Sequence, residues 1–119
     1  MYARNSAADG SGAWQIVVVD KSGGDVGYYP SLAVVNGNLA ISYFDYTSRD
    51  LKYVRASDVS GTIWGTPLTL DSTGIVGAYT PMAVVNGNPA ISYLDYNNLD
   101  LNKKLAKVGV DITHTTPRP

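Results

Sequence analysis

The most constraining feature of this chain is an internal repeat. Residues 26–51 (VGYYPSLAVVNGNLAISYFDYTSRDL) and residues 76–101 (VGAYTPMAVVNGNPAISYLDYNNLDL) are identical at 17 of 26 positions at an offset of 50. Residues 2–20 resemble residues 53–71 in the same way, with small length differences around the tryptophans. Repeats of this length are usually supersecondary units that bury their faces against neighbouring copies. The chain is therefore expected to contain two copies of one unit.

The two copies are cut out of phase. The first residues match the segment that begins at Lys52, and the second copy stops matching after Leu101. Joining Leu101 to Met1 restores the order of the internal copy, so residues 1–101 read as a closed circle of two units. We predict a domain of two circularly permuted repeats at 1–101 and a basic, non-repeat tail at 102–119. The charged residues of the tail are Lys103, Lys104, Lys107, Asp111 and Arg118.

The composition is typical of an all-β protein. Ten aspartates, no glutamate, 12 glycines and nine tyrosines leave few good helix formers and many strand and turn residues. The net charge of −1 does not favour a nucleic-acid partner. No apolar run approaches the roughly 20 residues of a membrane span, so no membrane association is expected. The absence of cysteine excludes disulfides and thiolate metal sites.

Each copy is expected to form four short antiparallel strands. In the first copy the predicted strands are 31–35, 39–45, 51–57 and 66–71. The dipeptides Asn36-Gly37 and Asn86-Gly87 each separate two β-type runs, which is the signal of a hairpin with a type I′ turn. The runs from Ala33 to Val35 and from Ala83 to Val85 are apolar throughout, which predicts a strand covered on both faces. Four antiparallel strands in about 50 residues is the size of a β-propeller blade.

One segment of the repeat resembles a known motif. The run from Ser57 to Trp64 (SDVSGTIW) is similar to the Asp-box of sialidase-like (BNR-repeat) β-propellers, S-x-D-x-G-x-T-W, although the spacing differs. The resemblance covers about eight residues of each unit and implies a hairpin between the third and fourth strands of a blade. In such families the Asp-box is structural and carries no catalytic residue. We therefore interpret Asp9, Asp58, Trp14 and Trp64 as turn and packing residues.

Two blades cannot close a propeller, which needs about four or more. The out-of-phase ends instead predict that each chain joins its half-blades to those of other copies in a homo-oligomeric ring. Three chains of six blades are favoured, and four chains of eight remain possible; the arrangement is similar to small two-repeat bacterial propeller lectins. Two alternatives stay open. The chain is a fragment of a longer propeller, or residues 103–112 supply a third strand to the last half-blade, which would block closure by the N-terminus of a neighbouring copy.

The candidate binding residues lie on loops that share one rim of a blade. These loops enter the first strand and connect the second strand to the third, and they are rich in tyrosine, aspartate and asparagine. Such residues suit a carbohydrate, because a tyrosine ring stacks on a sugar and polar groups bind its hydroxyls. The selected residues are Tyr28, Tyr29, Asp45, Tyr46, Arg49, Tyr79, Asp95, Tyr96 and Asn97. The competing interpretation is ordinary turn chemistry for most of them.

The functional prediction is a non-catalytic, lectin-like binding ring without cofactor or metal. A purely structural repeat without a ligand is the first alternative. A glycosidase or sialidase-like enzyme is the second, since Asp45 and Asp95 could supply a pair of carboxylates. These aspartates recur in both copies, however, whereas a catalytic centre usually breaks repeat symmetry. The single histidine, His114, lies in the tail.

Overall fold

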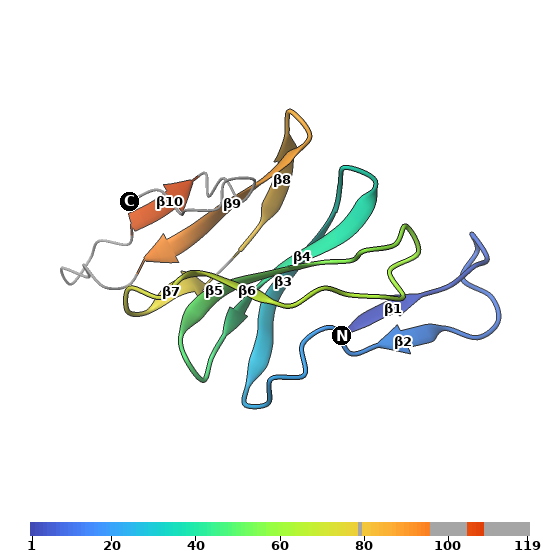
Figure 1. The fold of residues 1–119 in the computed structure, drawn as a ribbon, viewed down its shortest axis with the longest axis horizontal. Helices are drawn as coiled ribbons and strands as arrows, with labels where there is room; N and C mark the ends of the chain where they lie inside the picture. Colours follow the sequence, from blue (N-terminus) through green and yellow to red (C-terminus); the bar gives the residue numbers. More distant parts are fainter. Residues whose placement is uncertain (79, 96–104, 109–119) are drawn as a thin grey trace.

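The computed structural model describes residues 1–78, 80–95 and 105–108 (Figure 1). These residues form antiparallel strands and no helix, which confirms the all-β prediction. The strands are β1 Tyr2–Arg4, β2 Gln15–Val17, β3 Val26–Val35, β4 Asn38–Asp45, β5 Asp50–Arg55, β6 Leu68–Asp71, β7 Val76–Ala78, β8 Met82–Val85, β9 Asn88–Asp95 and β10 Leu105–Val108.

The central sheet is a meander in the order β3-β4-β5-β6, with every neighbouring pair antiparallel. Its strands coincide with the four predicted for the first copy, apart from their ends. The β3–β4 hairpin turns at Asn36 and Gly37, whose φ angles are 47° and 86°. A type I′ turn requires positive φ at both central residues, and asparagine and glycine adopt it readily. Asn86 and Gly87 make the same turn between β8 and β9, with φ of 52° and 78°.

The main difference from the predicted strands concerns the start of β3. The strand begins at Val26 rather than at residue 31, because Val26 and Tyr28 pair with the last residues of β4. This early part is irregular, with two register shifts before Ser31. In the second copy the equivalent strand is interrupted, so that β7 and β8 follow each other along β9.

Two smaller sheets flank the central one. We call β1–β2 the N-terminal hairpin and the group β7–β10 the C-terminal sheet. In the C-terminal sheet, β10 pairs with β9 and places Lys107 opposite Tyr93, as β5 places Lys52 opposite Tyr43. A strand from within 103–112 therefore does lie third in this sheet, which is the arrangement that the sequence left as an alternative.

The core consists of two clusters on opposite faces of the central sheet. The first interface, with the N-terminal hairpin, buries Tyr2, Val19, Ile41, Tyr43 and Val54. The second interface, with the C-terminal sheet, buries Val35, Ala40, Leu51, Tyr53, Val76, Ile91 and Tyr93. Figure 1 shows the hairpin on one side of β3–β6 and β7–β9 on the other. The central sheet is thus covered on both faces because it lies between two others.

The prediction that the first strand is covered on both faces is wrong for the single chain. Leu32 and Val34 on β3 are 54% and 58% exposed, although Val35 is 4% exposed. The two-stranded N-terminal hairpin is too narrow to reach over β3. The described strands form open sheets, without closure into a ring.

Candidate functional site

Three exposed tyrosines gather at one end of the central sheet. The ring centroid of Tyr28 lies 5.2 Å from that of Tyr46 and 6.2 Å from that of Tyr29. Phe44 contacts the group from β4, at 6.4 Å from Tyr29 and 6.1 Å from Tyr46. The tyrosines are 40–52% exposed, whereas Phe44 is buried. We call these four residues the aromatic corner.

The backbone of β3 turns two consecutive tyrosines toward this corner. In a regular strand, neighbouring side chains point to opposite faces. Here Gly27 and Tyr29 have φ of 97° and 51°, and the pairing with β4 shifts on both sides of Tyr28. A positive φ is rare for a bulky residue, so the surrounding structure must stabilise it. The bulged backbone brings together two rings that a regular strand would separate.

A carboxylate completes the corner. The Tyr28 hydroxyl donates a hydrogen bond of 3.0 Å to Oδ2 of Asp25, and this bond and the negative charge raise the pKa of Tyr28. The loop is held by the Asp25 N–H, which donates to Oγ1 of Thr47, and by the Tyr46 N–H, which donates to the Asp25 carbonyl. The loop before β3 and the β4–β5 turn therefore share one rim, as the sequence predicted.

The remaining predicted residues of the first copy belong to the turn. Asp45 is 8% exposed, and its Oδ1 accepts hydrogen bonds from the N–H groups of Thr47 (3.0 Å) and Ser48 (3.2 Å). Its other oxygen lies 3.9 Å from Nζ of Lys52. Arg49 is exposed at φ 64°, and its N–H donates to the Asp45 carbonyl. The structure thus groups Tyr28, Tyr29 and Tyr46, and engages the Asp45 carboxylate in the turn.

In the second copy, Asp95 is also buried, at 3% exposure. Tyr79, Tyr96 and Asn97 lie outside the described residues. The sequence nevertheless shows that this copy has a different corner, because Ala78 stands at the position of Tyr28 and Leu94 at that of Phe44. Sequence analysis missed Phe44; the signal that could have found it is this loss of two aromatic residues between otherwise similar copies.

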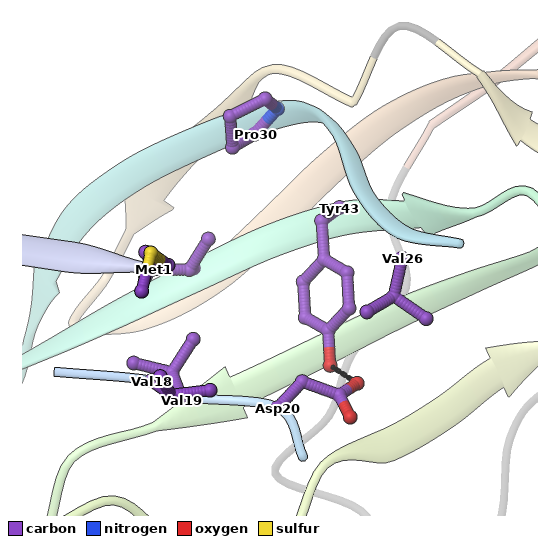
Figure 2. Close-up of a pocket in the computed structure, with 9 residues that line it drawn as sticks. Met1, Val18, Val19, Asp20, Val26, Pro30 and Tyr43 are labelled. Atoms are coloured by element: carbon purple, nitrogen blue, oxygen red, sulfur yellow. Dashed lines mark hydrogen bonds between the residues drawn. The ribbon is translucent and has the colours of Figure 1, made fainter. Parts of the chain in front are cut away.

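A pocket of about 160 Å³ lies at the first interface, lined in part by Val26, Gly27 and Pro30, which flank the tyrosines of β3. Figure 2 shows Met1, Val18 and Val19 on one side of it, Val26 on the other and the Tyr43 ring between them. The Tyr43 hydroxyl donates a 2.5 Å hydrogen bond to Asp20, and Nζ of Lys52 lies 3.1 Å from the same carboxylate oxygen. The pocket is therefore apolar with one polar wall.

The polar groups of this wall, Asp20, Tyr43 and Lys52, interact with one another. Burial alone would raise the pKa of Asp20, but hydrogen bonds from Ser22, Tyr43 and Lys52 outweigh burial and hold that pKa well below its usual range. Burial, followed by the bond to Asp20, raises the pKa of Tyr43. The same pair recurs at the second interface, where Tyr93 donates to Asp71 at 2.8 Å. This recurrence indicates a structural role for the aspartate–tyrosine pair.

The segment from Ser57 to Trp64 is a tight hairpin held by its aspartate. Oδ1 of Asp58 accepts hydrogen bonds from the N–H groups of Thr62 and Ile63, at 2.9 and 3.1 Å. The indole of Trp64 donates to the Gly61 carbonyl at 2.7 Å and packs 5.4 Å from the Tyr2 ring. These contacts agree with turn and packing roles for Asp58 and Trp64. Trp14, in contrast, is 55% exposed.

The described residues contain no group of three or more acidic or histidine side chains able to hold a metal ion. Within the same part of the chain, no helix has the length and apolar character needed to cross a membrane. Comparison of the chain with protein-family models, curated proteins and solved structures gives no match.

Proposed function

We propose that the protein is a non-catalytic carbohydrate-binding module whose sheets are β-propeller blades, completed into a ring by association of copies. The aromatic corner is its binding site. The observation that carries the carbohydrate part is the grouping of three exposed tyrosine rings beside Asp25 on a bulged, positive-φ backbone. A bulky residue in this conformation is retained where the geometry serves a purpose.

The chemistry of the corner suits a sugar. Tyrosine rings offer flat apolar faces for the C–H face of a pyranose, and their hydroxyls donate and accept hydrogen bonds. The Asp25 carboxylate adds an acceptor that is already held in place by Tyr28. Tyr29 reaches the corner from β3 and Tyr46 from the β4–β5 turn, and both rings pack against the buried Phe44, which supports the platform from below. A supported platform loses little conformational entropy when a ligand binds.

The first alternative is a structural repeat without a ligand. The turn contacts of Asp45 favour it, because they satisfy a predicted ligand residue within the protein. The enzyme alternative has less support. Of the predicted pair of carboxylates, Asp45 is engaged in its turn and Asp95 is buried. The carboxylate of Asp20 is also engaged in internal contacts, and it has a counterpart in Asp71 at the second interface.

A glycan array followed by calorimetric titration of the best ligand tests the carbohydrate proposal. We expect Tyr46→Ala to weaken binding about tenfold or more, which corresponds to about 1.4 kcal/mol. Tyr46→Phe keeps the ring and should lose less affinity. Val59→Ala, on a loop at 77% exposure, is the matched control and should bind as the parent does. No binding by the parent, or equal loss in the control, would favour the structural alternative.

A further inference from the structure

The two interfaces of the central sheet are built from the same residues of the repeat. The first interface joins the N-terminal hairpin to the central sheet, and the second joins the central sheet to the C-terminal sheet. The buried residues of the two interfaces occupy equivalent positions of the repeat, at offsets of 50 or 51. The corresponding pairs, first interface named first, are Tyr2 and Tyr53, Val19 and Leu70, Val26 and Val76, Ile41 and Ile91, and Tyr43 and Tyr93. Contacts that are present at the second interface but not at the first therefore indicate where the first interface is incomplete.

The second interface contains an additional contact. Val35 at the end of β3 is 4% exposed, and Met82 on β8 packs against the cluster to which Val35 belongs. The repeat equivalents of these residues are Val85 and Leu32. Both are 54% exposed, Leu32 on β3 of the central sheet and Val85 on β8 of the C-terminal sheet. Leu32 and Val85 are thus the equivalents of two residues that share a buried cluster, but in the single chain both remain exposed.

Gly27 and Gly77 also differ in how closely their surroundings pack. They are equivalent residues with φ of 97° and 99°. A Cβ on Gly77 would lie 2.6 Å from the Leu51 Cα, whereas nothing lies within 4 Å of a Cβ on Gly27. Gly27 instead lines the pocket of about 160 Å³. The pocket therefore lies where Leu51 of β5 packs at the second interface, next to the start of β1, which is the repeat equivalent of β5.

The pairing of β1 with β2 corresponds to the pairing of β5 with β6. Tyr2 pairs with Val17 as Tyr53 pairs with Leu68, so β1–β2 has the register of β5–β6 at an offset of 51. The other edge of β5 pairs with β4, whereas among the described residues β1 pairs with β2 alone. On β9, β10 covers Ser92 to Asp95. It leaves Ala90 and Ile91 without a described strand on that side.

From these observations we infer that the β8–β9 hairpin of a second copy of this chain completes the sheet begun by β1–β2. The register follows from the central sheet, where Ile41 pairs with Val54 and Ala40 with Arg55. By equivalence, Ala3 pairs with Ile91 of the second copy and Arg4 with its Ala90. Val85 of that copy then covers Leu32. The same register places Tyr2 and Met1 opposite Ser92 and Tyr93 of the second copy. Within the single chain Val108 and Lys107 face these two residues, so this end of β10 must leave the edge of β9 when the copies join.

This inference rests on the ring part of the proposed function and names its contact surface. The apolar surface on one side includes Leu32 and Val34, and on the other Val85. Exposed apolar patches joined to an unpaired strand edge are ordinary features of sites for β-sheet extension. Head-to-tail contacts between identical copies close into a ring when the rotation permits.

Engineered cysteines test the register directly, since the chain has no cysteine of its own. Arg4→Cys combined with Ala90→Cys should form disulfides between chains upon mild oxidation, because paired strand positions have the Cα separation that a disulfide requires. The N-terminal hairpin and β9 lie on opposite sides of the central sheet, so closure within one chain is not expected (Figure 1). Arg4→Cys combined with Val59→Cys is the control.

A ladder of covalent oligomers in Arg4→Cys/Ala90→Cys, absent from the control, is the expected result. Equal crosslinking in both, or none in either, overturns the register. Light scattering then tests the surface: the parent should have a multiple of 12.7 kDa, Leu32→Asp should give 12.7 kDa, and Val59→Asp should match the parent. A parent of 12.7 kDa at all concentrations overturns the assembly. The aromatic corner lies within one chain, so glycan binding by monomeric Leu32→Asp would separate the two proposals.

Discussion

The two copies of the repeat share most of their residues and differ in what surrounds them. The first copy lies in a complete four-stranded sheet with a neighbour on each face. Among the described residues, the second copy has a neighbour on one face, and its sheet receives β10 from outside the matched region. Val35 and Val85 end identical AVV runs, yet they are 4% and 54% exposed. Burial at these positions is thus a property of the neighbour and not of the strand itself.

The largest expected difference between the copies is at their equivalent glycines. Gly77→Ala should destabilise the protein by about 3–5 kcal/mol, because a strained φ and a clash with the Leu51 backbone add together. Gly27→Ala has the same strained φ without the clash, so we expect about 1–3 kcal/mol. Chemical denaturation of both variants gives the comparison.

The outcome of the glycine comparison also bears on assembly. If Gly27→Ala proves as destabilising as Gly77→Ala, the space beside Gly27 is filled in solution. A smaller loss for Gly77→Ala than for Gly27→Ala would contradict the packing of Leu51 against Gly77.

Acid stability should depend on the aspartate–tyrosine pair. The pKa of Asp20 is lowered in the folded protein, so this residue contributes stability that is fully present above the ordinary carboxyl pKa of about 4. That contribution is lost as the pH falls below this value. Asp20→Asn should lower stability at neutral pH by about 1–3 kcal/mol and flatten the acid limb of the profile. If denaturation between neutral and acidic pH shows the same loss of stability in Asp20→Asn as in the parent, Asp20 does not contribute to acid stability.

An effect of intermediate size is expected for the equivalent valines Val35 and Val85. Val35→Ala should cost about 1–2 kcal/mol, because it removes buried methyl groups from the second interface. Val85→Ala should stay within about 0.5 kcal/mol in the single chain, since this side chain is exposed. Equal losses, seen by thermal or chemical denaturation, would mean that Val85 is covered in solution.

The smallest effect concerns the first copy alone. Asp25→Asn weakens the hydrogen bond and removes the negative charge that together raise the pKa of Tyr28, so this tyrosine should titrate closer to its ordinary range. The tyrosinate absorbance reports the change, with Tyr28→Phe identifying the responsible ring. Folding should be unaffected, because both groups are at the surface. Unaltered titration in Asp25→Asn would show that the Tyr28–Asp25 bond is absent in solution.

Much of the fold was predictable because its signals are local. Asn36-Gly37 and Asn86-Gly87 specify their turns through a backbone conformation that few other residues adopt. The four strands predicted for the first copy all form and differ from the prediction only at their ends. For the site, the grouping of Tyr28, Tyr29 and Tyr46 followed from loops that share a rim. The engagement of Asp45 in its own turn matches the competing interpretation that the sequence had left open.

The sequence by itself determined the strands, their turns and the meander, because each depends on residues a few positions apart. Only the tertiary structure decided which equivalent residues are buried, since burial depends on a neighbouring sheet distant in sequence. Leu51 packs against Gly77 while the place beside Gly27 stays open, although both glycines have the same backbone conformation. The direction of Tyr29 was likewise decided by two register shifts against β4. Such shifts arise from long-range pairing, which no local pattern of residues specifies.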